Sequence, residues 1–177
     1  MYESGYIIDQ DVLDEIYEEM VQIISPRFLS RVTDYKSKNG KVNENSRKVL
    51  QHATHPNIYP EFCSQLEEYI GDGTKVNQID LLRYRTGDYF FAHQDDDSDA
   101  YRHNRRWSTS TVIHYTEDYE GGGLVIYDEF PDKNPNTKAT PIPLKVGQTA
   151  VFRSHLIHEA QPVVKGERWV IVAWLGA

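Results

Sequence analysis

The spacing of hydrophobic residues changes along the chain, and its first part has the period of a helix. Between Asp9 and Ser25, apolar side chains recur every three or four residues, which predicts an amphipathic α-helix. Asp9 or Asp11 is placed to cap this helix, and Pro26 ends it. Its apolar stripe consists of Val12, Leu13, Ile16, Tyr17, Met20, Ile23 and Ile24.

A second helix is predicted within residues 59–73. Pro60 suits a first helical turn, and Gly71 with Gly73 stops the helix. Its stripe consists of Phe62, Leu66, Tyr69 and Ile70, with Cys63 on the same side as a small buried residue. The polar segment between the two helices, residues 33–49, contains the turn signal Asn39-Gly40 and is expected to be a surface loop or hairpin.

After Val76 the period shortens to that of strands. Short runs rich in β-branched and aromatic residues are separated by glycine, proline and aspartate. The expected strands lie within residues 76–85, 88–93, 107–116, 122–129, 147–154 and 167–177. Because no helical pattern separates these runs, we expect an antiparallel sandwich or barrel rather than a parallel sheet.

Composition sets the class of protein. A length of 177 residues suits one domain with a real core. No window is apolar enough for a membrane span, and the first residues lack a secretory signal pattern. The single cysteine cannot form an internal disulfide, so we expect a soluble cytoplasmic protein. The net charge of −8 and the lack of a basic stripe beyond residues 101–107 disfavour nucleic acid as a partner.

Candidate chemistry begins at His93 and Asp95. Two residues apart on a strand, both side chains lie on one face and can approach one metal ion. Four aspartates, however, lie within residues 95–99, so a solvated acidic loop and a calcium loop are alternatives. An EF-hand-type loop starting at Asp95 fails, because Ala100 stands at the glycine position and Arg106 at the final glutamate position.

A third ligand would complete the set, and the sequence offers His155 and His158. Two histidines and one carboxylate with open positions form the facial triad of non-haem Fe(II) oxygenases. Arg168 follows ten residues after His158, within an otherwise apolar run. A buried arginine is costly unless it is paired, and its planar fork suits a carboxylate. The pattern predicts an anionic co-substrate that chelates the metal and reaches Arg168.

An ordered set of motifs carries a family resemblance. From about Ile79 to Trp174 the chain resembles the 2-oxoglutarate- and Fe(II)-dependent oxygenases, and among them the prolyl 4-hydroxylases, including the oxygen-sensing type. The residues of the pattern are Tyr84, Gly87, His93, Asp95, Thr111, Tyr115, Gly121 to Gly123, His158, Arg168 and Trp174.

The resemblance implies specific roles. The Fe(II) ligands would be His93, Asp95 and His158. Arg168 would hold the distal carboxylate of 2-oxoglutarate, Tyr115 would share it, and Tyr84 would contact the co-substrate. Asp95 argues for hydroxylation, because halogenating relatives have a small residue there. Ascorbate is an optional further cofactor of such enzymes.

The implied fold is mainly β: a double-stranded β-helix, or cupin-like jelly roll, with two N-terminal helices packed on one sheet. Residues 1–177 would form a single oxygenase domain, with helical support and a flap in residues 1–75 and the catalytic jelly roll in residues 76–177. The flap would lie at Tyr35–Val49, where Arg47 is placed to help hold a substrate chain.

The resemblance implies an enzyme that uses dioxygen and converts 2-oxoglutarate to succinate and CO2, with a prolyl residue of a peptide or protein as substrate. A free amino acid or another small molecule is the alternative. A non-catalytic cupin-like module is the alternative of another class, and Arg168 argues against it. Trp174 stands where nucleobase dioxygenases of the superfamily place a second arginine.

Structural or solvent-exposed roles remain open for individual residues. Asp96, Asp97 and Asp99 are expected at a solvated rim, and His155 competes with His158 as a ligand. Arg168 could instead form a structural salt bridge, and Tyr84 and Tyr115 could be core tyrosines. Trp174 belongs either to the core or to the substrate mouth.

Overall fold

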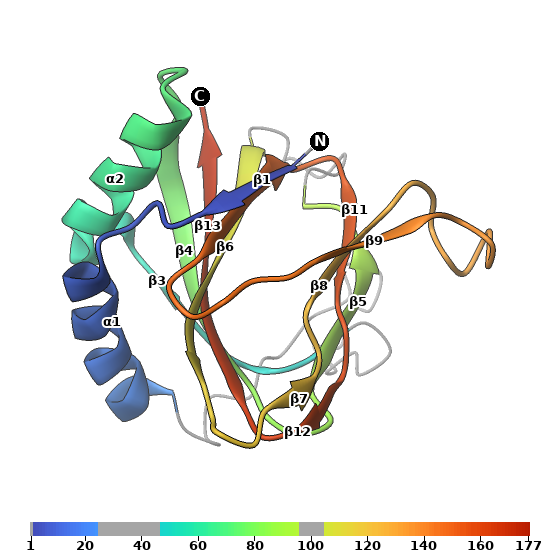
Figure 1. Cartoon of the computed structure of the whole chain (residues 1–177). Coiled ribbons are helices and arrows are strands. Elements are labelled where there is room, and N and C mark those ends of the chain that lie inside the picture. Colours follow the sequence, from blue (N-terminus) through green and yellow to red (C-terminus); the bar gives the residue numbers. More distant parts are fainter. Residues whose placement is uncertain (1, 25–46, 96–104) are drawn as a thin grey trace, which may run out of the picture.

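The computed structural model describes residues 2–24, 47–95 and 105–177. This part of the chain forms two facing antiparallel sheets with helices on one side (Figure 1). The helical elements are α1 (Gln10–Ile23), the short 3₁₀ turn η2 (Pro56–Ile58) and α2 (Pro60–Ile70). The expected mainly β jelly-roll fold with two N-terminal helices is confirmed.

The larger sheet has six strands in the order β1-β10-β6-β13-β4-β3. In this order they are β1 (Tyr2–Gly5), β10 (Thr149–Arg153), β6 (Arg105–Tyr115), β13 (Arg168–Gly176), β4 (Lys75–Tyr84) and β3 (Leu50–Thr54). Two long strands, β6 and β13, lie at its centre, and every ladder is antiparallel.

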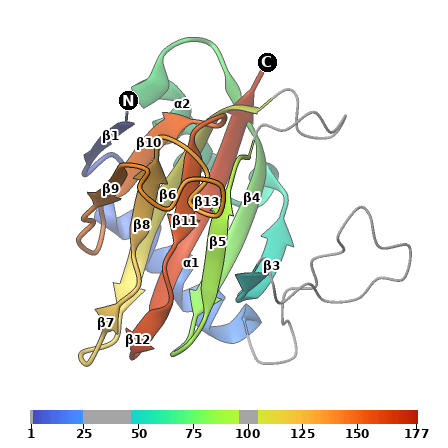
Figure 2. The same cartoon turned by 90° about the vertical axis from the view of Figure 1, so that its right-hand side faces the viewer.

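The smaller sheet has five strands in the order β2-β5-β11-β8-β9. They are β2 (Arg47–Lys48), β5 (Tyr89–His93), β11 (Ile157–Ala160), β8 (Leu124–Tyr127) and β9 (Ala139–Ile142). Figure 2 shows this sheet in front of the larger one. A two-stranded ribbon, β7 (Glu120–Gly121) with β12 (Val163–Lys165), closes one end.

Both helices pack their apolar stripes on the outer face of the larger sheet (Figure 1). Leu13 and Met20 of α1 and Phe62 and Leu66 of α2 are buried in one cluster with Ile171 of β13. Burying one such side chain stabilises the fold by about 1.5–3 kcal/mol, so the helices brace the sheet from outside. The inner face is left for the cavity between the sheets.

The helix ends differ in part from expectation. Gly71 ends α2 in the left-handed conformation with φ 67°, and its N–H donates to Glu67 O at 2.9 Å. Asp9 precedes α1, but its side chain does not cap the helix. Instead Asp9 Oδ2 accepts from Gln65 Nε2 at 3.1 Å, which ties α1 to α2. The predicted cap by the Asp9 side chain is wrong, because Asp9 Oδ2 accepts the hydrogen bond of Gln65 instead of one from the first turn of α1.

Each of the six expected runs contains a strand of the structure. The structure adds strands that the hydrophobic pattern does not show, including β1, β3, β9, β11 and β12. Most of the expected flap, and Asp96, Asp97 and Asp99 of the expected rim, lie outside the described residues. No helix in the described part of the chain is long and apolar enough to span a membrane.

Candidate active site

Three of the predicted ligands converge between the two sheets. His93 on β5 and His158 on β11 are paired across the antiparallel ladder, and Asp95 follows β5 directly. Asp95 Oδ1 lies 3.3 Å from His93 Nε2, and Asp95 Oδ2 lies 3.2 Å from His158 Nε2. All three ligand atoms lie within 4.8 Å of one another.

Backbone contacts fix the two imidazole rings. His93 Nδ1 is 2.7 Å from Phe91 O, and His158 Nδ1 is 2.9 Å from Leu156 O. A carbonyl oxygen only accepts, so each Nδ1 carries the proton and each Nε2 presents a lone pair to the common point. Cis ligands about 2.1 Å from one ion stand about 3 Å apart, close to the spacing of these atoms.

Asp95 is held by serines of the opposite sheet. Ser108 Oγ on β6 donates to Asp95 Oδ2 at 2.7 Å and lies 3.0 Å from Ser154 Oγ. The backbone N–H of Asp95 donates to Ser154 O at 2.9 Å. Ser108 lies on a predicted strand, and the alternation of residue types along that strand places its side chain on the inner face. The sequence analysis did not single it out as a site residue.

The charges of the triad suit metal binding. Burial opposes the charged form of Asp95, but His158 and His93 beside it hold the pKa of this carboxyl well below its usual range. Burial, together with the nearby His158, lowers the pKa of His93 to about 4. Burial opposes the charged form of His158, but Asp95 beside it raises the pKa of this imidazole, so a divalent ion would compete with a proton there. At neutral pH the site offers an anionic carboxylate and a neutral His93 imidazole, the forms that bind a divalent ion.

Arg168 begins β13 and lies between two tyrosines. It pairs in register with Tyr84 on β4 and Tyr115 on β6, and it is 2% exposed. Its guanidinium carbon stands 5.4 Å from the centre of the Tyr84 ring. Arg168 Nε has no hydrogen-bond partner, and no ion pair to Arg168 occurs among the described residues. A buried cation left in this state is costly, so an anionic ligand fits here and a structural salt bridge does not.

The tyrosines around Arg168 are protonated, and of these Tyr84 is buried while Tyr115 and Tyr119 are half-buried. Burial raises the pKa of Tyr84 to about 12, although Arg168 opposes the shift. Tyr115 Oη donates to Leu144 O at 2.9 Å, and its oxygen can still accept. Tyr119, which the sequence analysis missed, stacks on Tyr115 at 4.2 Å between ring centres. Its buried hydroxyl lacks a partner within the described ranges.

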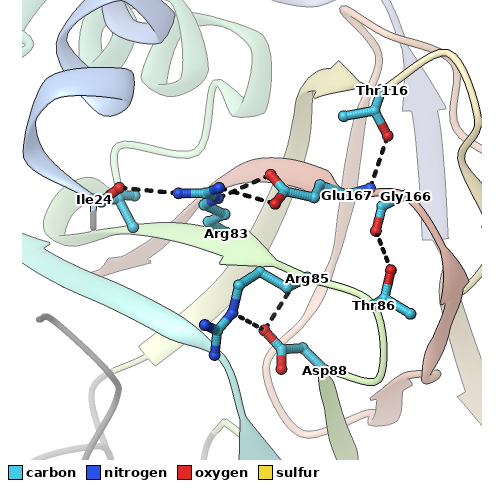
Figure 3. A network of polar contacts seen from close by, with 8 residues as sticks. All are labelled: Ile24, Arg83, Arg85, Thr86, Asp88, Thr116, Gly166 and Glu167. Carbon is cyan, nitrogen blue, oxygen red and sulfur yellow. Dashed lines mark hydrogen bonds and ion pairs between the residues drawn. The ribbon is translucent and has the colours of Figure 1, made fainter. Parts of the chain in front are cut away.

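A network of hydrogen bonds and ion pairs holds the start of β13 in place (Figure 3). Glu167, next to Arg168, accepts from Arg83 Nε at 2.9 Å and from Arg83 Nη2 at 2.8 Å. The backbone N–H of Glu167 donates to Thr116 Oγ1 at 2.8 Å. These contacts tie the residue before β13 to β4 and to the end of β6, so they position Arg168 without contacting a ligand.

One cavity of about 150 Å³ joins these groups. Its wall includes the triad, Tyr84 and Arg168, and Trp174 lines it as well, which places Trp174 at the site rather than in the core behind the sheet. His155 is exposed and belongs to a separate surface hollow with Tyr127, so it is not part of the ligand set.

Comparisons with known sequences identify the family of the chain. Residues 79–176 match the family model described as the 2OG-Fe(II) oxygenase superfamily. A PKHD-type hydroxylase of Idiomarina loihiensis is 26% identical over 139 residues, which is 77% of this chain and 56% of that protein. Prolyl 4-hydroxylase subunit alpha-1 of Rattus norvegicus is 26% identical over 188 residues, which is 93% of this chain and 33% of that protein. The chain thus spans about half the length, or less, of these curated relatives.

Solved structures share the fold. A Pseudomonas putida prolyl-4-hydroxylase superposes with a TM-score of 0.71 at 14% identity, covering 99% of this chain and 91% of that one. A Trichoplax adhaerens prolyl hydroxylase, solved with a hypoxia inducible factor peptide fragment, gives a TM-score of 0.73 at 14% identity, covering 99% and 83%. At this identity the likeness establishes the fold alone. The family match spans more than half of the chain and contains the triad and Arg168, so the chain belongs to the 2OG-Fe(II) oxygenase superfamily.

Proposed function

We propose that this chain is a 2-oxoglutarate- and Fe(II)-dependent hydroxylase of an unactivated C–H bond, most simply of a prolyl residue in a peptide or protein. The observation that carries the proposal is the joint presence, in one cavity, of a His-Asp-His set and a buried arginine whose Nε has no hydrogen-bond partner and which forms no ion pair among the described residues. When bound, Fe(II) with 2-oxoglutarate supplies dioxygen activation, with succinate and CO2 as co-products.

The residues of the chain have separate tasks in this proposal. His93, Asp95 and His158 would hold the Fe(II) ion, which would bind the co-substrate and supply the activation of dioxygen. Arg168 binds the distal carboxylate of 2-oxoglutarate. Tyr84 and Tyr115, which lie beside Arg168 on the neighbouring strands, are placed to form hydrogen bonds there. Apolar side chains of the wall between these two ends, Leu82, Leu124, Phe152 and Val170, exclude water from the reacting atoms.

The prolyl substrate is supported by the names of the relatives, which are prolyl 4-hydroxylases and PKHD-type hydroxylases. A free amino acid is the second candidate, and the small cavity with charged groups favours it. A non-catalytic binding module is disfavoured, because such a module gains nothing from the buried Arg168. We place the activity in the cytoplasm, with ascorbate as an optional reductant.

The test needs no knowledge of the substrate. Fe(II) and then 2-oxoglutarate are added to the protein without oxygen, and the weak visible charge-transfer band of the chelate is recorded. We expect the band in the wild type and in His155→Ala, whose imidazole lies outside the site, and its loss in His158→Ala. If no band forms while other divalent ions bind, the chain is a metal-binding module and the proposal fails.

A further inference from the structure

Ser110 on β6 presents a buried hydroxyl to the cavity. The residue is 6% exposed and belongs to the cavity wall. Its Oγ forms no hydrogen bond within the described part of the chain. The two preceding residues differ in this respect, because Ser108 Oγ donates to Asp95 and Thr109 Oγ1 donates to Ala173 O at 3.2 Å. Leaving a buried hydroxyl unpaired is costly, so the place of Ser110 fits a polar ligand in the cavity.

The register of β6 with β13 places this hydroxyl between the metal ligands and Arg168. At one level Ser108 binds Asp95, and at another Tyr115 is paired with Arg168. Ser110 follows Ser108 by two residues on the way to Tyr115. Both serine side chains therefore lie on the same face of the strand, about 7 Å apart along it. A co-substrate that binds both the metal and Arg168 runs past the hydroxyl of Ser110.

The described side chains beside Ser110 offer it no partner. At its level β10 contributes Ala150 and β13 contributes Val172, and both are apolar. Asp80 lies at the same level on β4, two strand spacings or about 10 Å away, and its carboxylate accepts from two glutamine amides. The hydroxyl of Ser110 is therefore a single donor in an otherwise apolar stretch of these three central strands.

The metal end of 2-oxoglutarate requires such a donor. A 2-oxo acid that chelates an ion through its oxo group and one carboxylate oxygen leaves the second carboxylate oxygen off the metal. In a site that excludes water, this charged oxygen is costly without a donor. The metal ligands supply none, because an ionised Asp95 only accepts and the Nδ1 of each histidine donates to a backbone carbonyl. A serine hydroxyl has one proton to donate, and hydrogen bonds to charged acceptors are the stronger ones.

We propose that Ser110 is a further co-substrate-binding residue, whose Oγ donates a hydrogen bond to the metal-end carboxylate of 2-oxoglutarate. The inference rests on the proposed hydroxylase function and deepens it. The two polar contacts of the chain with the co-substrate then have different tasks. Arg168 recognises the second carboxylate and thus the length of the diacid, whereas Ser110 recognises the 2-oxo acid end, whatever follows it.

The experiment compares two 2-oxo acids that share the metal end and differ at the other end. 2-Oxobutyrate keeps the oxo group and its carboxylate but lacks the distal carboxylate of 2-oxoglutarate. Each acid is titrated without oxygen into the Fe(II)-loaded protein, and its affinity is taken from the charge-transfer band. Because a charge-assisted hydrogen bond is lost, Ser110→Ala is expected to weaken the binding of both acids about 10- to 100-fold. Arg168→Lys is expected to weaken the binding of 2-oxoglutarate alone.

Further variants separate a contact with the co-substrate from general loosening of β6. Without a 2-oxo acid, Ser110→Ala is expected to bind Co(II) as the wild type does, because Ser110 has no bond to a metal ligand. Ser110→Cys, whose thiol is a weaker donor of similar size, is expected to bind both acids with intermediate affinity. The matched control is Thr111→Val, which removes a hydroxyl of the same strand that lies outside the cavity, 2.7 Å from Thr149 Oγ1. This control should lower thermal stability and leave both affinities unchanged.

Two results overturn the inference. One is a Ser110→Ala variant that binds both 2-oxo acids as tightly as the wild type does. The other is a loss confined to 2-oxoglutarate, which would place the effect of the hydroxyl at the distal end. In both cases the wild type still forms the chelate band with 2-oxoglutarate, so the proposed function stands while the inference falls. Absence of that band in the wild type, by contrast, is the failure of the proposed function itself.

Discussion

Replacing Ser108 by alanine tests how the opposite sheet holds the metal-binding carboxylate. Ser108 Oγ donates to Asp95 Oδ2 at 2.7 Å, and Ser108 is 2% exposed. The substitution deletes one oxygen and leaves the backbone of β6 and the three ligands in place. Asp95 then loses its only side-chain hydroxyl donor among the described residues and is free to turn away from His158.

The size of the effect follows from the charge on the acceptor. A hydrogen bond to a charged group contributes about 1.5–3 kcal/mol, and each 1.4 kcal/mol is a factor of about ten in affinity. Part of this free energy is recovered, because the bound metal ion itself orients the Asp95 carboxylate. We therefore expect Ser108→Ala to weaken divalent metal binding about 10- to 100-fold, the usual effect of losing a partner of a metal ligand.

The assay is a competition between the protein and a chelator for Co(II), followed by the visible absorbance of the bound ion. The control is Ser110→Ala, which removes a hydroxyl from the same strand and the same cavity wall, 6% exposed, with no bond to Asp95. Ser154→Ala is expected to weaken metal binding less, because among the described residues Ser154 Oγ contacts only the hydroxyl of Ser108, at 3.0 Å. The double variant should show less than additive loss, since both changes act on Asp95.

Equal Co(II) affinity in Ser108→Ala and Ser110→Ala would refute this reasoning. It would mean that His93 and His158, through the metal, orient Asp95 without help from β6. A loss of affinity shared by both variants would instead point to general loosening of the strand, and thermal unfolding of each variant separates that outcome from the specific one.

The remaining predictions concern the co-substrate end and the core. Arg168→Lys should raise the KM for 2-oxoglutarate about 10- to 100-fold, because the bidentate guanidinium is lost, while Co(II) affinity stays unchanged. An unaltered KM in steady-state succinate assays would show that Arg168 does not bind the co-substrate. Glu167→Gln breaks the ion pair with Arg83, whose nitrogens lie 2.8 and 2.9 Å from the carboxylate. It should raise the KM for 2-oxoglutarate several-fold and change kcat little. Lys75→Gln, which breaks the more exposed ion pair with Glu67, is the control. Leu66→Ala, at a fully buried position, should lower the free energy of unfolding by about 2–5 kcal/mol in urea titration, and a loss below about 1 kcal/mol would contradict the packing of α2 on the sheet.

The helices and the central strands could be predicted because their hydrophobic patterns are strong. The stripe of α1 and the apolar run of β13 determine which side chains face the core, whatever lies around them. Strands β3 and β9 are edge strands of five and four residues, and each contains a single large apolar residue, Leu50 or Ile142, which is too few to show a pattern. Strand β11 contains His158, yet its four residues, Ile157–Ala160, are too few to show a period.

The ligands could be predicted from spacing, but their supports could not. His93 and Asp95 share a strand face by the two-residue repeat, and the family pattern supplies His158. The hydroxyl of Ser108 meets Asp95 only because two sheets face each other, and short-range sequence patterns do not contain that distance. Asp80 is different, because an acid inside the apolar run of β4 is a local signal of the same kind as Arg168. That signal was present in the sequence and was not used.

Arg105 and Arg168 show how far the sequence can distinguish two similar residues. Both are arginines at the start of a long central strand, both are at most 9% exposed, and both line the same cavity. The strands β6 and β13 are antiparallel, so these two strand starts lie at opposite ends of the shared ladder, where Arg105 is paired with Gly176 and Arg168 with Tyr115. The fold thus brings two buried arginines to opposite ends of one cavity. In the sequence only the family pattern, with its ten-residue spacing from His158, distinguishes Arg168 from Arg105.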